Sequence, residues 1–235
     1  GGVPENFRNW FVIRFDKPFN GFRVFNGKTE LKGFEAEGEH ALAAVYFATR
    51  RGEQVTARVA SSFISEEQAV RNLETEVGDA DFEAVKARAQ ARWDEVLGRI
   101  SGEGGTEEQY RTFYSCLYRS TLFPRKFYEI GADGNPIHYS PYNGEVLPGY
   151  MYTDTGFWDT FRSLFPLLNL VYPSVNAEIQ AGLANAYRES GFLPEWASPG
   201  HRGCMVGNNS ASVVADAILK GVTPAEDVAV LYEAM

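Results

Sequence analysis

The hydrophobic pattern of this chain changes its period at Ser65, and that change sets the fold class. Before Ser65, short β-branched and aromatic runs are separated by turns such as Asn20-Gly21 and Asn26-Gly27, which predicts antiparallel strands. The expected strands are 10–15, 21–25, 41–48 and 54–63. After Ser65, apolar residues recur every three or four positions, as in helices. We therefore expect an α+β chain with its strands first.

The last expected strand has a clear alternation, because Val55, Ala57, Val59 and Phe63 share one face. Strands of this kind belong to a sandwich or a layered antiparallel sheet. Four strands are few for a complete sandwich. Residues 1–64 are therefore interpreted as a portion of a β-sandwich.

Helix signals begin directly after these strands. Ser65 with Gln68 is a capping box, and Thr106 with Gln109 is another. Between them Asp81 can cap a helix with apolar residues at helical spacing. The apolar residues of that helix are Phe82, Val85, Ala89, Trp93 and Val96. We interpret 65–105 as linker helices.

The Gly-rich segment 101–105 predicts a hinge before the last part of the chain. The helix expected after it has an apolar stripe wide enough to predict burial on more than one side. That stripe is Tyr110, Phe113, Tyr114, Leu117, Tyr118 and Leu122. Residues 106–235 are interpreted as a separate helical domain.

Within that domain, a turn at Asp133–Pro136 predicts a hairpin between 127–128 and 137–139, followed by a loop rich in Tyr and Gly. Helices then alternate with short loops. They are expected at 158–170, from 173 to Gly191, at 210–220, and from Thr223 onward, with Pro224 as the first helical residue of the last one. This alternation is typical of an α/α barrel, of which the chain would hold about half.

Two polar, aromatic loops lie at the ends of these helices. Trp158-Asp159 is followed by Arg162, and the second loop carries Glu195-Trp196. An indole ring can hold the apolar face of a sugar, while carboxylate and guanidinium groups bind its hydroxyls. Taken singly, each Trp could equally pack a core and each carboxylate cap a helix. Two such pairs favour a carbohydrate site.

Two further carboxylates are open to local explanations. Asp154 can bind a sugar or cap the helix that follows it. Asp216 lies among alanines in a helix, and we interpret it as a structural residue that ties adjacent helices.

Charge and composition exclude some partners. A net charge of −9 argues against nucleic acid and anionic membranes, which both require a basic surface. No apolar run approaches the roughly 20 residues that cross a bilayer. The cysteines, Cys116 and Cys204, are too few for a disulfide framework and lack metal-ligand spacing. The chain begins Gly-Gly-Val and stops inside an expected helix, so we expect it to be a piece of a longer protein.

Four stretches of the chain also carry a family resemblance. They are SSFISEEQAVRNL (61–73), TEEQYRTFYSCLYR (106–119), GFWDTFR (156–162) and ADAILKG (215–221). As an ordered set they resemble glycoside hydrolase family 92, a family of exo-acting α-mannosidases. The resemblance covers nearly the whole chain.

This resemblance implies the end of a β-sandwich, linker helices and the first part of an (α/α)6 barrel. It also implies a calcium ion, and release of terminal α-linked mannose from glycans, including N-glycans, with inversion. The catalytic base and the calcium ligands would lie beyond Met235, so no metal ligand is assigned in this chain. A secreted or periplasmic location is expected.

The chain departs from the family pattern in one loop. Many members have an Asn-Glu-Thr run before a Cys-Met pair, and its glutamate is the general acid. This chain has His201-Arg202-Gly203 there, and is one residue shorter between Trp196 and Cys204. Some relatives act on mannose linked through phosphate, a leaving group that needs no protonation, and His201 and Arg202 would suit such an anion.

The preferred hypothesis keeps an acid in this loop, because glycosidases normally use two carboxylates. Glu195 is then the general acid, Asp159 and Arg162 bind sugar hydroxyls, and Trp158 and Trp196 form the pocket wall. The alternatives are a mannosyl-phosphate hydrolase and a non-catalytic mannoside-binding module. A phosphorylase or lyase with a Tyr152 or His201 base also stays open.

Overall fold

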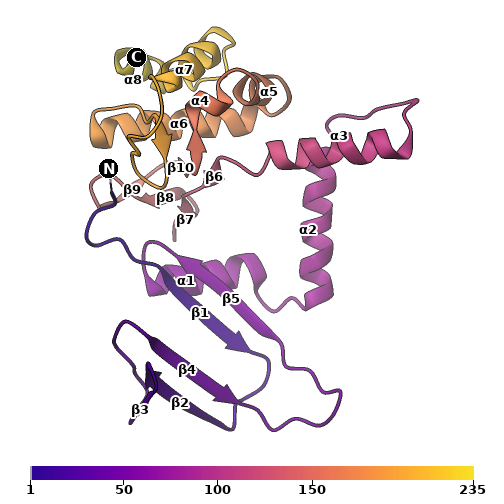
Figure 1. Cartoon of the computed structure of the whole chain (residues 1–235), viewed down its shortest axis with the longest axis vertical. Coiled ribbons are helices and arrows are strands. Elements are labelled where there is room, and N and C mark those ends of the chain that lie inside the picture. The colour runs from indigo at the N-terminus through magenta and orange to yellow at the C-terminus, as the bar shows by residue number, and fades with distance from the viewer. Residues whose placement is uncertain (1) are drawn as a thin grey trace.

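The computed structural model describes residues 2–235 and consists of two units connected by a helical arm, as Figure 1 shows. Antiparallel strands form the N-terminal unit, and helices form most of the C-terminal unit. The arm lies to one side and consists of α2 (Phe82–Leu97) and α3 (Glu107–Ser120). The predicted order of strands followed by helices is confirmed.

Small antiparallel sheets make up the N-terminal unit. Its strands are β1 (Trp10–Phe15), β2 (Gly21–Asn26), β3 (Thr29–Leu31), β4 (Ala41–Tyr46) and β5 (Ala57–Ser62). β1 pairs with β5, with Ile13 opposite Val59, and β2 lies between β3 and β4. The expected strands are confirmed. β3 is an additional strand, formed after a left-handed turn at Gly27 (φ +59°).

The apolar face of β5 is exposed in this chain. Val59 has 55% of its surface accessible, whereas Ser62, on the opposite face, is buried. Helix α1 (Glu66–Asn72) packs against β1 and β5. Within residues 2–235, no second layer covers the Val59 face.

Helix α1 begins with half of the predicted capping box. The Ser65 hydroxyl accepts a hydrogen bond from the Gln68 backbone N–H at 3.1 Å. The Gln68 side chain does not return to Ser65; it donates to Asn72 Oδ1 at 2.9 Å and to the Ile130 carbonyl at 2.8 Å. The Gln68 side chain bonds Asn72 and Ile130, and not Ser65, because Gln68 is buried against the next unit, where its amide needs partners.

Glu129 holds the two units together. Its carboxylate accepts hydrogen bonds from Ser62 Oγ at 3.0 Å, Phe63 N at 2.8 Å and Asn72 Nδ2 at 2.7 Å. These donors come from β5, the segment after it and α1. The SSFISEEQAVRNL stretch therefore has a structural role at the seam.

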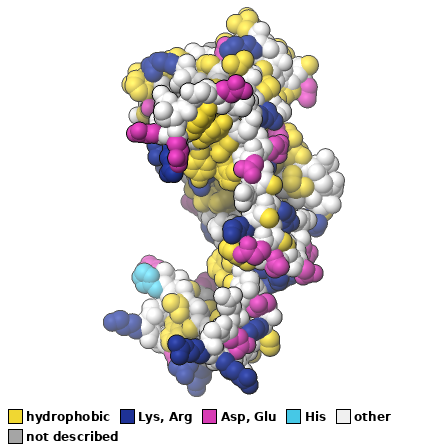
Figure 2. Space-filling model, turned by 90° about the vertical axis from the view of Figure 1, so that its right-hand side faces the viewer, with side chains coloured by type: hydrophobic (Ala, Val, Ile, Leu, Met, Phe, Trp, Pro, Cys, Tyr) yellow, Lys and Arg dark blue, Asp and Glu magenta, His cyan; other side chains and the backbone are white. Residues whose placement is uncertain are grey.

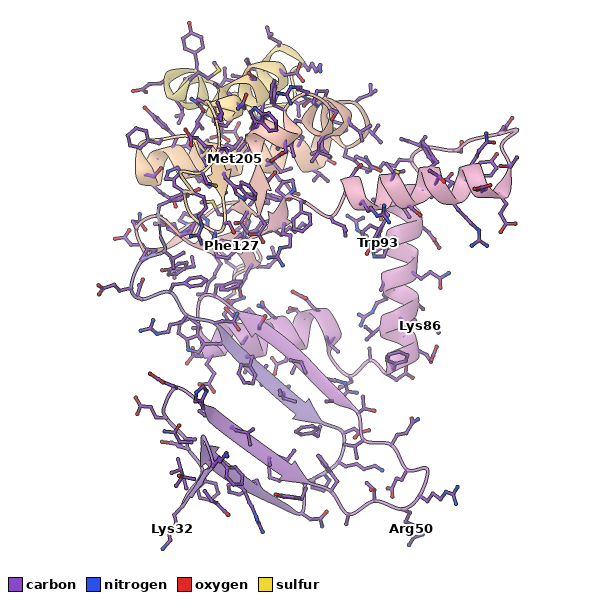
Figure 3. The ribbon with its side chains drawn as sticks, viewed as in Figure 1. Lys32, Arg50, Lys86, Trp93, Phe127 and Met205 are labelled. Carbon is purple, nitrogen blue, oxygen red and sulfur yellow. The ribbon has the colours of Figure 1, made fainter. Side chains whose placement is uncertain are left out.

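The arm is held by local caps and has little buried surface. The Asp81 carboxylate accepts from Ala84 N at 2.8 Å, and the Thr106–Gln109 capping box is complete. Leu117 is the only buried residue of α3, whereas Phe113 is 43% exposed. The prediction that α3 is buried on more than one side is therefore wrong. Its aromatic stripe instead contacts α2 near Trp93, which Figure 3 labels. The ring centroids of Trp93 and Tyr118 lie 4.6 Å apart.

A small sheet connects the arm to the helices. It contains β7 (Glu129–Ile130), β8 (Pro136–Tyr139) and β9 (Val146–Pro148). The predicted hairpin is confirmed as β7–β8, although β7 begins two residues later than expected. Beside it, β6 (Arg125–Lys126) pairs with β10 (Tyr152–Thr153).

The helices of the C-terminal unit depart from expectation in two places. They are α4 (Phe157–Thr160), α5 (Leu164–Val171), α6 (Pro173–Ser190), α7 (Asn209–Leu219), a 3₁₀ turn η2 (Ala225–Asp227) and α8 (Val228–Ala234). The single helix predicted at 158–170 is wrong, because a turn at 161–163 separates α4 from α5. In one continuous helix, the ring of Pro166 would collide with the Arg162 carbonyl.

The other departure is at the last helix. Pro224 has ψ 137°, so it is not the first helical residue, and helical geometry begins at Ala225. The ends of the preceding helices agree with the prediction, because Gly191 (φ +78°) and Gly221 (φ +68°) adopt the left-handed conformation that follows a helix.

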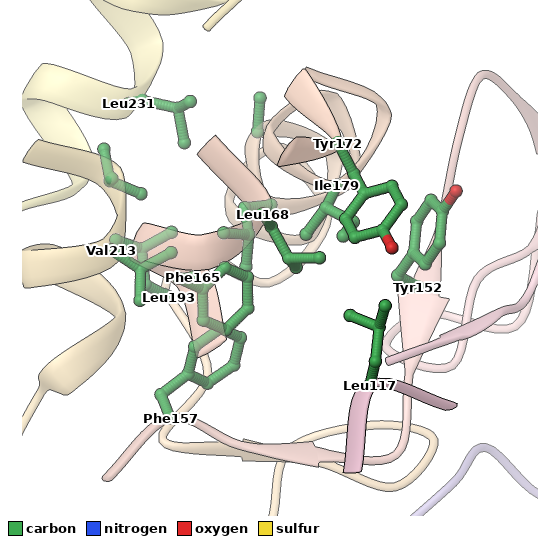
Figure 4. Packing of buried hydrophobic residues seen from close by; sticks show 13 residues of the cluster. Leu117, Tyr152, Phe157, Phe165, Leu168, Tyr172, Ile179, Leu193, Val213 and Leu231 are labelled. Carbon is green, nitrogen blue, oxygen red and sulfur yellow. The ribbon is translucent and has the colours of Figure 1, made fainter. Parts of the chain in front are cut away.

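The main core lies in the C-terminal unit (Figure 4). Phe157 stacks on Phe165 with their ring centroids 5.6 Å apart. The Tyr172 hydroxyl donates to the Val96 carbonyl at 3.0 Å and so joins the arm to this core. Burial of the apolar side chains of this cluster stabilises the helical unit.

A polar network crosses the same helices. Asp216 on α7 accepts from Asn169 Nδ2 of α5 at 2.8 Å and from Lys220 Nζ at 2.7 Å. Asn169 Oδ1 in turn accepts from Asn176 Nδ2 of α6 at 2.6 Å. The interpretation of Asp216 as a residue that ties helices is confirmed.

Figure 2 shows the face seen from the right of Figure 1. Hydrophobic side chains gather on its upper half, and Lys and Arg side chains on its lower end. Among residues 2–235, no helix has both the length and the apolar character needed to cross a membrane.

Candidate functional site

The two polar, aromatic loops meet in a short two-stranded ribbon. β11 (Thr155–Gly156) pairs antiparallel with β12 (Trp196–Ala197), and Gly156 lies opposite Trp196. Just beyond the ribbon, Phe157 N donates to the Glu195 carbonyl at 3.1 Å. The structure therefore brings the two loops together. They are about forty residues apart in sequence, and backbone pairing brings them together.

Phe157 anchors the first loop. Its side chain is 2% exposed and packs in the core, so the residues after it point outward. Trp158 is 42% exposed and Asp159 is also exposed. These exposures favour a binding role over core packing for Trp158, because a core residue would not leave this much of its surface accessible.

Asp159 and Trp196 approach each other across Gly156. A Cβ atom placed on Gly156 would lie 2.8 Å from Asp159 Oδ2 and 3.3 Å from Trp196 Cε3. The carboxylate and the indole therefore both lie against this backbone, and only glycine leaves room for them. An acidic acceptor beside a partly exposed aromatic ring is suited to a sugar.

Arg162 packs against two aromatic rings. It lies in the turn after α4, and its guanidinium stacks 4.9 Å from the Trp158 ring centre and 4.6 Å from that of Phe161. Its Nη1 also donates to the Trp158 carbonyl at 3.4 Å. Arg162 thus braces Trp158. Its predicted contact with substrate stays a prediction.

Glu195 precedes Trp196 at the end of the ribbon and is half-buried. Its backbone is fixed by the hydrogen bond from Phe157. The carboxylate lies near enough to His201 to favour the charged imidazole. The assignment of Glu195 as general acid stays a prediction.

His201 is turned inward. Its Nε2 lies 2.8 Å from Ser190 Oγ, and its ring contacts Tyr142 with 4.7 Å between centroids. Burial lowers the pKa of His201 below its ordinary value, although the Glu195 carboxylate acts in the opposite direction. The neutral ring is therefore favoured.

Arg202 supports the loop from its exposed side. Its Nε donates to the Ser198 carbonyl at 2.8 Å, and its backbone N–H donates to the Trp196 carbonyl at 2.8 Å. These contacts fold the loop back on the ribbon. Contact of His201 and Arg202 with a substrate stays a prediction.

Asp154 has a role that neither sequence interpretation described. Its Oδ2 accepts from Arg125 Nε at 2.6 Å and also contacts Arg125 Nη2, while Oδ1 accepts from Ser198 Oγ at 3.1 Å. The cap interpretation is wrong, because the N-cap of α4 is Gly156 and no side chain caps that helix. Arg125 and Ser198 carried no sequence signal, since their partnership exists only in the folded chain.

Tyr152 is unsuited to act as a base. Its hydroxyl donates to Glu178 Oε2 at 2.6 Å, and Tyr128 donates to the same oxygen at 3.0 Å. Burial raises the pKa of Tyr152, and the hydrogen bond to the Glu178 carboxylate raises it further. Tyr152 is thus a neutral donor in the core.

The described residues do not form a metal site by themselves. Throughout 2–235, no group of three or more His, Cys, Asp or Glu side chains is placed to hold an ion. The calcium ion implied by the family resemblance stays a prediction, and no chemical step is assigned to it here.

Comparison with known proteins establishes the family. Residues 68–235 match the model of the glycosyl hydrolase family 92 catalytic domain, and residues 1–62 match that of its N-terminal domain. The chain belongs to glycosyl hydrolase family 92. The family predicted from the sequence is confirmed. The finer division at 64 and 105 stays a prediction.

Solved structures agree with this membership. An inverting mannosidase of family GH92 from Bacteroides thetaiotaomicron VPI-5482 is 51% identical, with a TM-score of 0.89, over all of this chain and 32% of its own. A family GH92 α-mannosidase from Bacteroides thetaiotaomicron, solved with mannoimidazole, is 29% identical with a TM-score of 0.82. The match covers 96% of this chain and 30% of that one.

One curated protein is also similar to this chain. A protein of Arthroderma benhamiae described as an uncharacterized secreted glycosidase is 31% identical over 189 residues. The match covers 77% of this chain and 20% of the relative. The chain therefore spans less than a third of the length of each of these relatives.

Proposed function

We propose that this chain is part of an exo-acting α-mannosidase that releases terminal α-linked mannose from glycans with inversion. The observation that carries the proposal is the β11–β12 ribbon, which sets Trp196 and Glu195 beside Gly156 and Asp159. The names of the solved relatives, an inverting mannosidase and an α-mannosidase bound to mannoimidazole, support this substrate class.

In this proposal the chain supplies one half of the site. Trp158 and Trp196 provide apolar walls, and Asp159 accepts hydrogen bonds from sugar hydroxyls. Helices α4 to α8 begin an (α/α)6 barrel, and the N-terminal unit is the end of a β-sandwich. The catalytic base and the calcium ligands come from residues beyond Met235.

Inversion requires two carboxyl groups with a water molecule between them. One protonates the departing oxygen, and the other, about 6.5–9.5 Å away, removes a proton from the water. We assign the first role to Glu195, because it is fixed at the end of the ribbon beside Trp196.

The mannosyl-phosphate alternative receives less support. An anion site at this loop would need His201 to be charged and to face the substrate. Instead its Nε2 contacts Ser190, and burial lowers its pKa. The lyase and phosphorylase alternatives also receive less support, because the Tyr152 hydroxyl donates to Glu178 and is not available as a base.

The experiment is Glu195→Gln in the full protein that the gene encodes, because glutamine keeps the shape but cannot give a proton. Hydrolysis of an unactivated α-mannoside should fall by about 10²–10⁴-fold, while aryl mannosides with good leaving groups should lose far less. Glu108→Gln, on the exposed surface of α3, is the matched control.

The outcomes separate the alternatives. Equal losses on both kinds of substrate would mean that Glu195 only positions the loop. A full protein that binds mannosides but releases no mannose would be a binding module. Unchanged hydrolysis of a mannosyl phosphate by Glu195→Gln, together with a loss in Arg202→Ala, would favour the phosphate-linked substrate.

A further inference from the structure

Asp154 has an unusual backbone conformation for its position. It is the only residue other than glycine with positive φ (+60°) within 2–235. It lies between β10 and β11, and these strands pair with different partners, β6 and β12. A left-handed residue at this point lets the chain change partners, and aspartate tolerates that conformation better than most residues.

The carboxylate of Asp154 uses one oxygen for each partner strand. Oδ2 accepts from Arg125, which lies on β6 directly opposite Thr153. Oδ1 accepts at 3.1 Å from Ser198 Oγ, just after β12. The Asp154 side chain is 19% exposed, so water competes little for its oxygens.

The loop after β12 is fixed at neighbouring points as well. Thr153 Oγ1 donates to the Pro199 carbonyl at 3.3 Å, and Arg202 Nε donates to the Ser198 carbonyl at 2.8 Å. Asp154 is therefore the charged centre of a set of contacts that joins β6, β10 and the loop of β12. This set is adjacent to the ribbon that carries Gly156 and Trp196, because Asp154 directly precedes β11 and Ser198 directly follows β12.

We propose that Asp154 is a positioning residue, which acts through Arg125 and Ser198 to hold Glu195 and Trp196 in register with Asp159. This inference rests on the proposed function, because it assumes that Glu195 delivers a proton. Asp154 itself touches no substrate in this arrangement. A shift of the loop by about 1 Å is enough to slow a proton transfer about 100-fold.

The test uses variants of Asp154 that separate backbone from side chain. Asp154→Gly keeps the left-handed backbone free of strain but removes both contacts. Asp154→Asn keeps an acceptor for Ser198 but loses the charge that pairs with Arg125. Arg125→Met removes the same ion pair from the other side. Glu107→Gln, which breaks the exposed Arg111–Glu107 pair on α3, is the matched control.

In the full protein, Asp154→Gly should lower kcat on an unactivated α-mannoside by about 10- to 100-fold, with a much smaller change in KM. On an activated aryl mannoside the loss should be smaller, because proton delivery matters less there. The kcat of Asp154→Asn on the unactivated α-mannoside should lie between the values of Asp154→Gly and the wild type. Arg125→Met should reproduce Asp154→Asn, and Glu107→Gln should match the wild type.

Hydrogen exchange provides a readout that is independent of activity. Phe157 N and Arg202 N donate hydrogen bonds across the ribbon and its loop. Peptides that cover these amides should exchange faster in Asp154→Gly than in the wild type, while peptides from α7 stay unchanged.

The outcomes distinguish this inference from the proposed function. If the wild type releases mannose but Asp154→Gly has wild-type kcat, or loses equally on both substrates, the positioning role is overturned and the function stands. If the wild type releases none, the proposed function fails. Exchange then decides the role of Asp154, because unchanged exchange at Phe157 and Arg202 would overturn it.

Discussion

Gly156 shows how much of the site depends on a single missing atom. The Asp159 carboxylate and the Trp196 indole both occupy space that any side chain at Gly156 would enter. Their closeness is therefore a property of this backbone and not of the two side chains alone. It explains why these groups form one surface.

We expect Gly156→Ala to impair hydrolysis without unfolding the protein. The new methyl group would lie 2.8 Å from Asp159 Oδ2, so the flexible carboxylate must move away from the sugar site. A fall of about tenfold in kcat/KM of the full protein is expected. Gly21→Ala, whose methyl group would meet no atom within 4 Å, is the control. Wild-type kinetics for Gly156→Ala would show that Asp159 does not contact the substrate.

The ring of His201 predicts a pH dependence of stability. Burial lowers its pKa in the folded state, so the unfolded state binds more protons below the ordinary value of 6.5. The contribution of the neutral His201 ring to the free energy of unfolding is therefore complete above about pH 6.5. It is lost as the pH falls through the pKa of His201 in the folded state.

This dependence can be measured with His201→Gln. Denaturant unfolding of the wild type and the variant from about pH 5 to 8 should show the wild-type advantage shrinking below pH 6.5. A difference that stays constant over this range would contradict the prediction.

At the scale of elements, the ribbon and the polar network connect segments that are distant in sequence. Asp216 joins α7 to α5, and Asn169 extends the contact to α6. Asn169 is 7% exposed, so its amide depends on this partner. The packing of α5, α6 and α7 also supports Phe157 and, through it, the loop of Trp158.

We expect Asp216→Ala to lower the free energy of unfolding by about 1–3 kcal/mol, because the buried amide of Asn169 loses its acceptor. The substitution of Glu233, an exposed residue of α8, by alanine should change stability far less. Denaturant titration of both variants would check this. Similar midpoints for the two would mean that water replaces Asp216 without cost.

At the scale of the molecule, apolar side chains of β5 and of the arm are exposed. The chain spans 32% of the length of a solved relative. In the proposed function, the remaining part of the site, including the base, lies outside these residues. The net charge of −9 agrees with a neutral sugar as partner.

We expect residues 1–235 alone to hydrolyse no α-mannoside. One carboxyl group cannot both protonate the leaving oxygen and activate water on the opposite face of the sugar. Incubation with an aryl α-mannoside and excess calcium should therefore give no release above the blank. Robust turnover would show that both carboxylates lie within this chain.

The sequence by itself determined the features whose interactions are local. The strands before Ser65, the caps at Asp81 and Thr106, and the helix end at Gly191 were predicted because each signal acts within about one turn of its own position. The family was also predicted, since ordered motifs survive in the chain as a set. The pairing of Trp with carboxylates indicated the candidate site.

Only the tertiary structure decided how distant residues meet. Ser198 is 44 residues from Asp154, and Arg125 is 29 residues from it, so no local pattern could predict their contacts. The same limit explains why the Gln68 side chain donates to the Ile130 carbonyl of β7 and does not complete its capping box. It also explains why the apolar stripe of α3 is largely exposed. Periodicity shows which face of an element is apolar, but burial depends on what packs against that face.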